Sequence, residues 1–112
     1  EIEDNTLTGV ALDGFRMAVV KKEVQSTGDI KAVIPSRTLQ EITRILDKDE
    51  NTIKVFLQKN LLFVEVENTC LFSRVMEGEF VKYNHILPTS FTNTVTVNKN
   101  ALLSSIERAS IS

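Results

Sequence analysis

Apolar and β-branched residues dominate two short stretches near the start of the chain, residues 6–12 and 15–23, with Asp13-Gly14 between them. Such runs favour β-strands, and an Asp-Gly pair between two of them is a strong signal of a tight hairpin. A type I′ turn, a common two-residue connection, needs positive φ at both central residues. The pattern therefore predicts two paired strands joined by a type I′ turn at Asp13-Gly14.

The next segment changes from a strand pattern to a helical one. Residues 30–35 are apolar and β-branched, which predicts a third strand that Pro35 ends, with Ser36 as the N-cap of a helix. Over residues 37–46 the period is helical, with an apolar side opposite a mostly basic one. The apolar side carries Leu39, Ile42, Ile45 and Leu46, and the polar side carries Arg37, Gln40, Glu41, Arg44 and Lys48.

Three further strands and a second helix are expected after this helix. Residues 52–57, 61–67 and 69–75 are strand-like, with tight turns at Lys59-Asn60 and Asn68. Residues 80–88 have no clean period and are expected to form an ordered surface loop. Residues 94–97 alternate like a strand, and Asn98 can cap a final helix. The apolar side of that helix carries Leu102, Leu103, Ile106 and Ala109. This order of elements predicts an α+β fold.

Composition and charge are those of an ordinary globular protein. The 112 residues suffice for one hydrophobic core, and 13 Lys and Arg against 15 Asp and Glu leave any basic surface local. The single Cys70 excludes an internal disulfide and favours a reducing compartment. No apolar run approaches the roughly 18 residues of a membrane span, and the acidic start is unlike a signal peptide. We therefore expect a cytoplasmic protein.

No catalytic or metal-binding constellation stands out. The four glycines are too scattered for a phosphate-binding loop, and one His with one Cys excludes the common His/Cys metal sites. Cys70 and His85 could act as nucleophile and base, but Cys70 falls mid-strand among apolar residues, where a small buried thiol is expected instead. Glu65 and Glu67 share one strand face and are expected to be solvated rather than a catalytic pair. We expect no enzyme and no cofactor.

Two features leave alternatives open. His85 in its loop is either simply exposed or part of a binding surface. The basic side of the first helix is either a solvated face or a nucleic-acid contact, and Glu41 within it favours the solvated face. The residues alone thus indicate an α+β domain without an active site.

Three motifs, however, resemble those of one family. The stretches LDGFRMAV, VIPSRTLQEITRIL and CLFSRVMEGEFVKYNHILP follow the order and nearly the spacing of the bacterial sliding clamp, the beta subunit of the replicative DNA polymerase III. That family carries a T-D-G-H-R-L-A hairpin, a V-P-x-K helix start and a strand running into x-E-G-x-F-P-D-Y. The resemblance implies the DNA-clamp fold, with antiparallel sheets outside and two amphipathic helices on the inner, DNA-facing side.

The resemblance also implies how the chain is divided. The family has three similar domains per chain. This sequence looks like the second half of the middle domain, residues 1–91, joined to the first strand and helix of the C-terminal domain, residues 92–112. The chain begins without Met and ends at Ser112 inside the second expected helix, so we expect a fragment of a longer protein.

The implied function is that of a non-enzymatic processivity factor. Two full-length chains close a ring around duplex DNA, and the ring slides along the DNA without sequence preference. Polymerase, clamp-loader and other replication or repair proteins bind the ring through short linear peptides. The matching peptide-binding positions are Leu12, Gly14, Phe15, Arg16 and Met17 on the hairpin and Val81, His85 and Ile86 on the loop. The matching DNA-facing positions are Arg37, Arg44, Lys48 and Arg108.

Several of these positions differ from the commonest family pattern. Leu12 stands where Thr is usual, Phe15 replaces His, Val81-Lys82 replaces Pro-Asp, and His85 stands at a position that is often basic. An apolar cleft for Leu or Phe anchors of a peptide remains the expectation. The alternative is a truncated clamp-like interaction module that assembles through its strand edges without encircling DNA.

Overall fold

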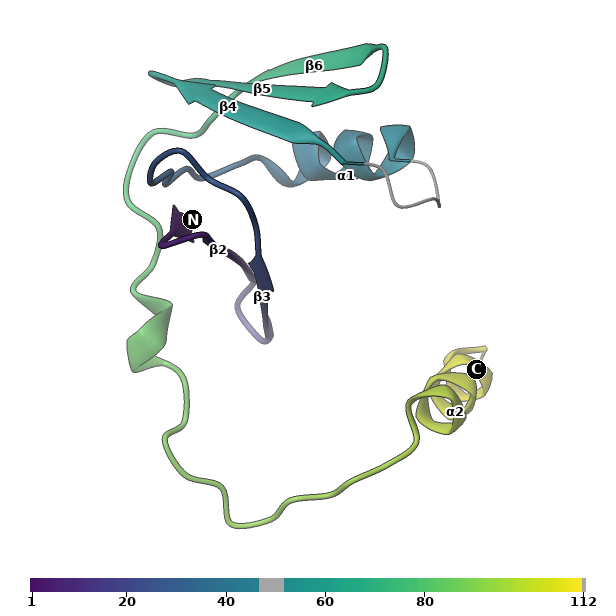
Figure 1. The fold of residues 1–112 in the computed structure, drawn as a ribbon. Helices are drawn as coiled ribbons and strands as arrows, with labels where there is room; N and C mark the ends of the chain where they lie inside the picture. The colour runs from purple at the N-terminus through teal and green to yellow at the C-terminus, as the bar shows by residue number, and fades with distance from the viewer. Residues whose placement is uncertain (47–51, 112) are drawn as a thin grey trace. The chain divides into compact units, whose positions relative to one another are not determined.

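The computed structural model describes residues 1–46 and 52–111. The chain forms two compact units, Glu1–Phe80 and Val81–Ser112. The described residues contain antiparallel sheets and two α-helices, which confirms the predicted α+β class (Figure 1).

In its described residues the first unit has two three-stranded antiparallel sheets and one helix (Figure 1). The first sheet has the order β1 (Ile2–Glu3), β2 (Thr6–Leu12), β3 (Met17–Glu23). The second has the order β4 (Lys54–Gln58), β5 (Leu61–Val66), β6 (Thr69–Arg74). Helix α1 (Ser36–Ile45) packs against this second sheet.

The two hairpins of the first sheet have different turns. Glu3 pairs with Thr6 across Asp4 and Asn5, whose φ values of 47° and 59° are both positive, as a type I′ turn requires. Leu12 pairs with Met17, so the β2–β3 connection is the four-residue loop 13–16. The predicted hairpin is therefore confirmed and its predicted type I′ turn is wrong.

The longer loop has a physical cause in the Asp13 side chain. Neither Asp13 nor Gly14 has the positive φ of a type I′ turn. Instead the Asp13 carboxylate accepts hydrogen bonds from the backbone N–H groups of Phe15 and Arg16. Asp side chains commonly compete with the backbone in this way. As a result Phe15 and Arg16 belong to the loop, and β3 begins at Met17 rather than at residue 15.

The hydrophobic core of the first unit lies between α1 and the second sheet. Alternate residues of the central strand, Leu62, Val64 and Val66, are only 2%, 1% and 3% exposed. Strand alternation places all three on one sheet face, and burying each such side chain contributes about 1.5–3 kcal/mol. Partly buried residues pack against them: Ile34, Ile42, Ile45, Leu46, Ile53, Leu57, Leu71 and Val75. Leu39, predicted on the apolar side of the helix, is 45% exposed instead.

The opposite face of the second sheet carries an aromatic ladder. Phe63 pairs in register with Phe56 and Phe72, and the ring centroids lie 5.5 Å and 4.7 Å from it. Cys70 pairs with Glu65 and is exposed, so the predicted buried thiol is wrong. The reason is strand parity: its neighbour Leu71 packs against the core, and successive side chains on a strand point to opposite faces.

Two predicted strands are absent from the described residues. Residues 30–35 make only isolated bridges, Ile30 with Ile2 of β1 and Val33 with Met76 beyond the end of β6, and form no ladder of their own. Residues 94–97 are irregular. A β-branched sequence becomes a strand only when a neighbouring strand accepts and donates its backbone hydrogen bonds.

Of the two predicted N-caps, the one for α1 is wrong and the one for the second helix is confirmed. Pro35, not Ser36, is the N-cap of α1, and no side chain caps that end. In the second unit Asn98 caps α2 (Lys99–Ser110), and its Oδ1 accepts a hydrogen bond from the Ala101 N–H at 3.1 Å. Within the predicted loop 80–88 lies one 3₁₀ turn, η1 (Tyr83–His85).

Candidate functional site

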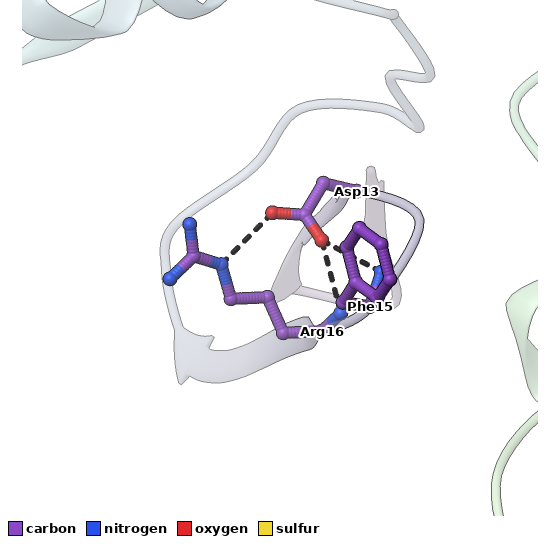
Figure 2. Close-up of polar contacts among 3 residues, drawn as sticks. All are labelled: Asp13, Phe15 and Arg16. Carbon is purple, nitrogen blue, oxygen red and sulfur yellow. Dashed lines mark hydrogen bonds and ion pairs between the residues drawn. The ribbon is translucent and has the colours of Figure 1, made fainter.

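The tip of the β2–β3 hairpin is organised by the Asp13 side chain (Figure 2). Its Oδ1 accepts hydrogen bonds from the Phe15 N–H at 2.8 Å and the Arg16 N–H at 3.0 Å. Its Oδ2 accepts one from Arg16 Nε at 2.8 Å. The Asp13 N–H in turn donates to the Arg16 carbonyl at 3.0 Å. One carboxylate therefore engages three donors within the four-residue loop.

These contacts favour the charged form of Asp13. The N–H of Phe15, then the Arg16 side chain, then the N–H of Arg16 lower the pKa of the Asp13 carboxyl below its ordinary value of 3.8. Hydrogen bonds and a nearby positive charge stabilise a carboxylate relative to its neutral acid. At neutral pH Asp13 is thus ionised and all three contacts are charge-assisted.

The side chains around this tip face solvent to different degrees. Phe15 is fully exposed, Leu12 is 38% exposed, and Met17 is half-buried. The Arg16 side chain is 89% exposed although its Nε is engaged. In Figure 2 the Arg16 side chain folds back toward the carboxylate, while the Phe15 ring lies on the other side of the loop. The tip therefore presents a large apolar ring and a guanidinium to the solvent.

Gly14 lies at this tip in a backbone conformation that does not require glycine. Its φ is not in the left-handed region, and a Cβ built on it meets no atom within 4 Å. A side chain at position 14 is therefore compatible with the fold of the hairpin. The absence of one leaves the backbone of the tip open to a partner.

The loop residues of the site prediction lie in the second unit. Val81 is 52% and Ile86 59% exposed, and His85 is exposed at the end of η1. Backbone hydrogen bonds order this turn: the Tyr83 N–H donates to the Val81 carbonyl at 2.7 Å, and the Ile86 N–H to the Tyr83 carbonyl at 2.9 Å. Hairpin and loop thus belong to different units, and their convergence in one cleft stays a prediction.

The predicted DNA-facing residues lie on two helices. Arg37 and Arg44 are exposed on α1, where Arg44 Nη1 lies 2.7 Å from Glu41 Oε1. Arg108 is exposed on α2, and its Nη2 donates to Ser105 Oγ at 3.3 Å. Lys48 lies outside the described residues. Their approach to DNA stays a prediction.

The carboxylates considered as a catalytic pair do not share a strand face. Glu65 on β5 forms a 3.9 Å ion pair with Lys54, and Glu67 sits in the following turn with φ of 49°. Over residues 1–46 and 52–111 no group of three or more His, Cys, Asp and Glu is arranged to hold a metal ion. Neither helix found in these ranges is long and apolar enough to cross a membrane.

Comparison with known proteins decides the family. The sequence model of the DNA polymerase III beta subunit, central domain, matches residues 1–82. The chain belongs to this family.

Relatives and solved structures agree with this assignment. The chain is 32% identical to the beta sliding clamp of Halalkalibacterium halodurans, covering 97% of this chain and 30% of that protein. It is 33% identical to the beta sliding clamp of Streptococcus pneumoniae, over 92% of this chain and 28% of that protein. The chain therefore spans about 30% of the length of the curated relatives it matches.

Two crystal structures are similar over nearly the whole chain. A putative DNA polymerase III beta subunit from Eubacterium rectale aligns with a TM-score of 0.85 and 36% identity, covering 98% of this chain and 31% of that one. The DNA polymerase III beta chain of Streptococcus pneumoniae aligns with a TM-score of 0.76 and 32% identity, covering 94% and 28%. The sheets and helices described above are thus those of the DNA polymerase III beta subunit fold.

The role of the Asp13 side chain does not follow from the hairpin pattern. That pattern predicts positive φ at Asp13, whereas its carboxylate accepts the backbone N–H groups of the loop. The available signal was Asp at the first position of a turn, where its carboxylate can accept the N–H groups two and three residues on.

Proposed function

We propose that this chain is a segment of a sliding clamp, a non-enzymatic processivity factor that closes a ring of two full-length chains around duplex DNA. The observation that carries the proposal is the family match over residues 1–82, supported by the similar structures from Eubacterium rectale and Streptococcus pneumoniae. In this proposal residues 1–91 belong to the middle domain of the clamp and residues 92–112 begin its C-terminal domain. A replication protein of this kind acts in the cytoplasm and needs no cofactor.

The proposal includes a peptide-binding site at the hairpin tip. Leu12, Phe15 and Met17 supply apolar surface there, and Val81 and Ile86 supply exposed apolar side chains on the loop. Covering one Leu or Phe side chain of a partner peptide contributes about 1.5–3 kcal/mol. His85, Arg16 and the open backbone of Gly14 provide polar contacts at the edge of such a site. The proposed ligands are short linear peptides of polymerase, clamp-loader and other replication or repair proteins.

The proposal places Arg37, Arg44, Lys48 and Arg108 along the DNA-facing side of the helices. Contacts between such residues and phosphates carry no sequence information, which suits a protein that must slide. The Glu41–Arg44 ion pair is no obstacle, because exposed pairs of this kind contribute only about 0–1 kcal/mol and exchange readily for a phosphate.

Retention on DNA tests the ring. The full-length protein that contains this sequence is loaded onto nicked circular DNA by its clamp loader, and half of each sample is then cut once. The proposal predicts retention on the circle through high salt and release after cutting, since a ring slides off a free end. Equal loss from circular and linear DNA would overturn it.

A second candidate is an interaction module that assembles through its strand edges. It is favoured by β3, an edge strand that among the described segments pairs only with β2. Lys21 and Lys22 weigh against it, because exposed lysines on an edge strand discourage pairing with another chain. Sedimentation of the 112-residue chain distinguishes the candidates: concentration-dependent oligomers favour edge assembly, and a concentration-independent monomer excludes it.

A further inference from the structure

We infer that Asp13 is the positioning residue of the peptide-binding hairpin: its carboxylate holds loop 13–16 in the conformation that presents Phe15 and Arg16 to a partner peptide. This inference rests on the proposed function. Asp13 itself need not touch the peptide, and it is not among the residues predicted to bind it.

Few bonds other than those to the Asp13 side chain hold the tip. The loop closes through the Asp13 N–H donating to the Arg16 carbonyl at 3.0 Å. The reverse bond, in which the Arg16 N–H would donate to the Asp13 backbone carbonyl, is replaced by the 3.0 Å bond to Asp13 Oδ1. The same oxygen accepts the Phe15 N–H at 2.8 Å. Without this side chain the Phe15 N–H loses its acceptor in the loop, and the Arg16 N–H must change its partner.

The Phe15 side chain contributes nothing to its own placement. Phe15 is 101% exposed, and its ring takes part in neither ring contact found among the described residues. No packing therefore fixes its backbone, which leaves the hydrogen bond to its N–H as the contact that sets its direction. An exposed aromatic ring on a fixed backbone is a preorganised binding element, since less conformational entropy is lost when the partner docks.

The Arg16 side chain is held by the same carboxylate. The contact from its Nε to Asp13 Oδ2 at 2.8 Å folds the side chain back onto the loop (Figure 2). Its two terminal nitrogens have no partner within residues 1–46 and 52–111. Asp13 thus orients the guanidinium and leaves its outer N–H groups available to a peptide carbonyl or carboxylate.

Preorganisation has a measurable consequence. If the binding-competent loop is only a fraction of the population, the apparent dissociation constant rises by the inverse of that fraction. Asp13→Ala removes all three side-chain contacts. Asp13→Asn keeps an oxygen that can accept both backbone N–H groups and loses the ion pair with Arg16. The two variants therefore separate the positioning of the loop from the charge.

The experiment measures binding of a fluorescent peptide with Leu and Phe anchors to the full-length protein by anisotropy, with thermal unfolding followed in parallel. We expect Asp13→Ala to weaken binding about tenfold with only a small fall in the melting temperature, and Asp13→Asn to stay within about threefold of wild type. Asp13→Ser, whose hydroxyl can accept one N–H, should fall between them and replaces the alanine variant if that does not fold.

A reference variant separates failure of this inference from failure of the proposed function. Met17→Asp places a charge in the proposed apolar site and should abolish binding. If Met17→Asp abolishes binding and Asp13→Ala binds like wild type, the positioning role is wrong and the site stands. Equal losses in Asp13→Ala and Asp13→Asn would also overturn it, because charge rather than loop geometry would then be responsible. If Met17→Asp binds like wild type, the proposed site itself fails.

Discussion

Asp13 Oδ2 and Arg16 Nε lie 2.8 Å apart across the four-residue loop that joins β2 to β3. The pair is exposed, so alone it stabilises the fold little. Its importance is that the same carboxylate also binds two backbone N–H groups, which turns a flexible connection into a defined surface.

The pKa of Asp13 should lie below 3.8 in a carbon-detected NMR titration. Because the folded pKa is lowered, the stability from these contacts is fully present above the ordinary carboxyl range and is lost as pH falls through the folded pKa. Arg16→Gln should raise the pKa only partway, because the N–H of Phe15 is the largest cause and remains. A pKa at or above the ordinary value in the wild type would contradict the loop geometry.

Leu62→Ala should destabilise the first unit by about 2–5 kcal/mol, since it leaves a cavity beside α1 where the side chain is 2% exposed. Leu61→Ala is the matched control: it makes the same change one residue earlier, where the side chain is 40% exposed. Its cost should be clearly smaller. Urea unfolding of both variants measures the difference, and equal costs would mean that α1 does not cover this face.

Asn98→Ala should destabilise α2 by about 1 kcal/mol, because the Ala101 N–H loses its side-chain acceptor. Amide hydrogen exchange in the first turn of α2 measures the effect. Asn100→Ala, inside the helix and exposed, serves as the control and should leave exchange unchanged or slow it. Identical behaviour of the two variants would exclude Asn98 as the cap.

Cys70 should react with a water-soluble thiol reagent in the native protein almost as fast as in denaturant, because its side chain is exposed on β6. A thiol buried in the core would be protected until the protein unfolds. The ratio of native to denatured labelling rates is the measurement. Strong protection in the 112-residue chain would contradict the placement of Cys70 on the sheet face opposite to Leu71.

The sequence predicts those parts of the fold that are determined by residues close together in the chain. The bounds of β2, the starts of β5 and β6, and the Asn98 cap were predicted well, because period, β-branching and capping act within a few residues. The strands expected at 30–35 and 94–97 failed, since a strand also needs a partner that local sequence does not supply.

The candidate site likewise has parts that the sequence predicts and parts that it does not. The hairpin and the residues around its tip follow from local pattern and from the family resemblance. The type of turn does not, because the Asp13 side chain outcompetes the backbone for the N–H groups of Phe15 and Arg16. The exposure of Cys70 could not be deduced either, since it depends on which face of the sheet α1 covers.

The most direct test of the account is the affinity of a Leu- and Phe-containing peptide for the full-length protein carrying one charge in β3. Met17 lies next to the tip, and Met17→Asp places the charge there. Val20→Asp is the control, because it places the same charge in the same strand at a residue that is 62% exposed. We predict at least about a tenfold loss of affinity for Met17→Asp, which corresponds to the loss of one or more buried apolar contacts. Val20→Asp should bind nearly as well as wild type. Wild-type affinity in Met17→Asp, or equal losses in both variants, would contradict it.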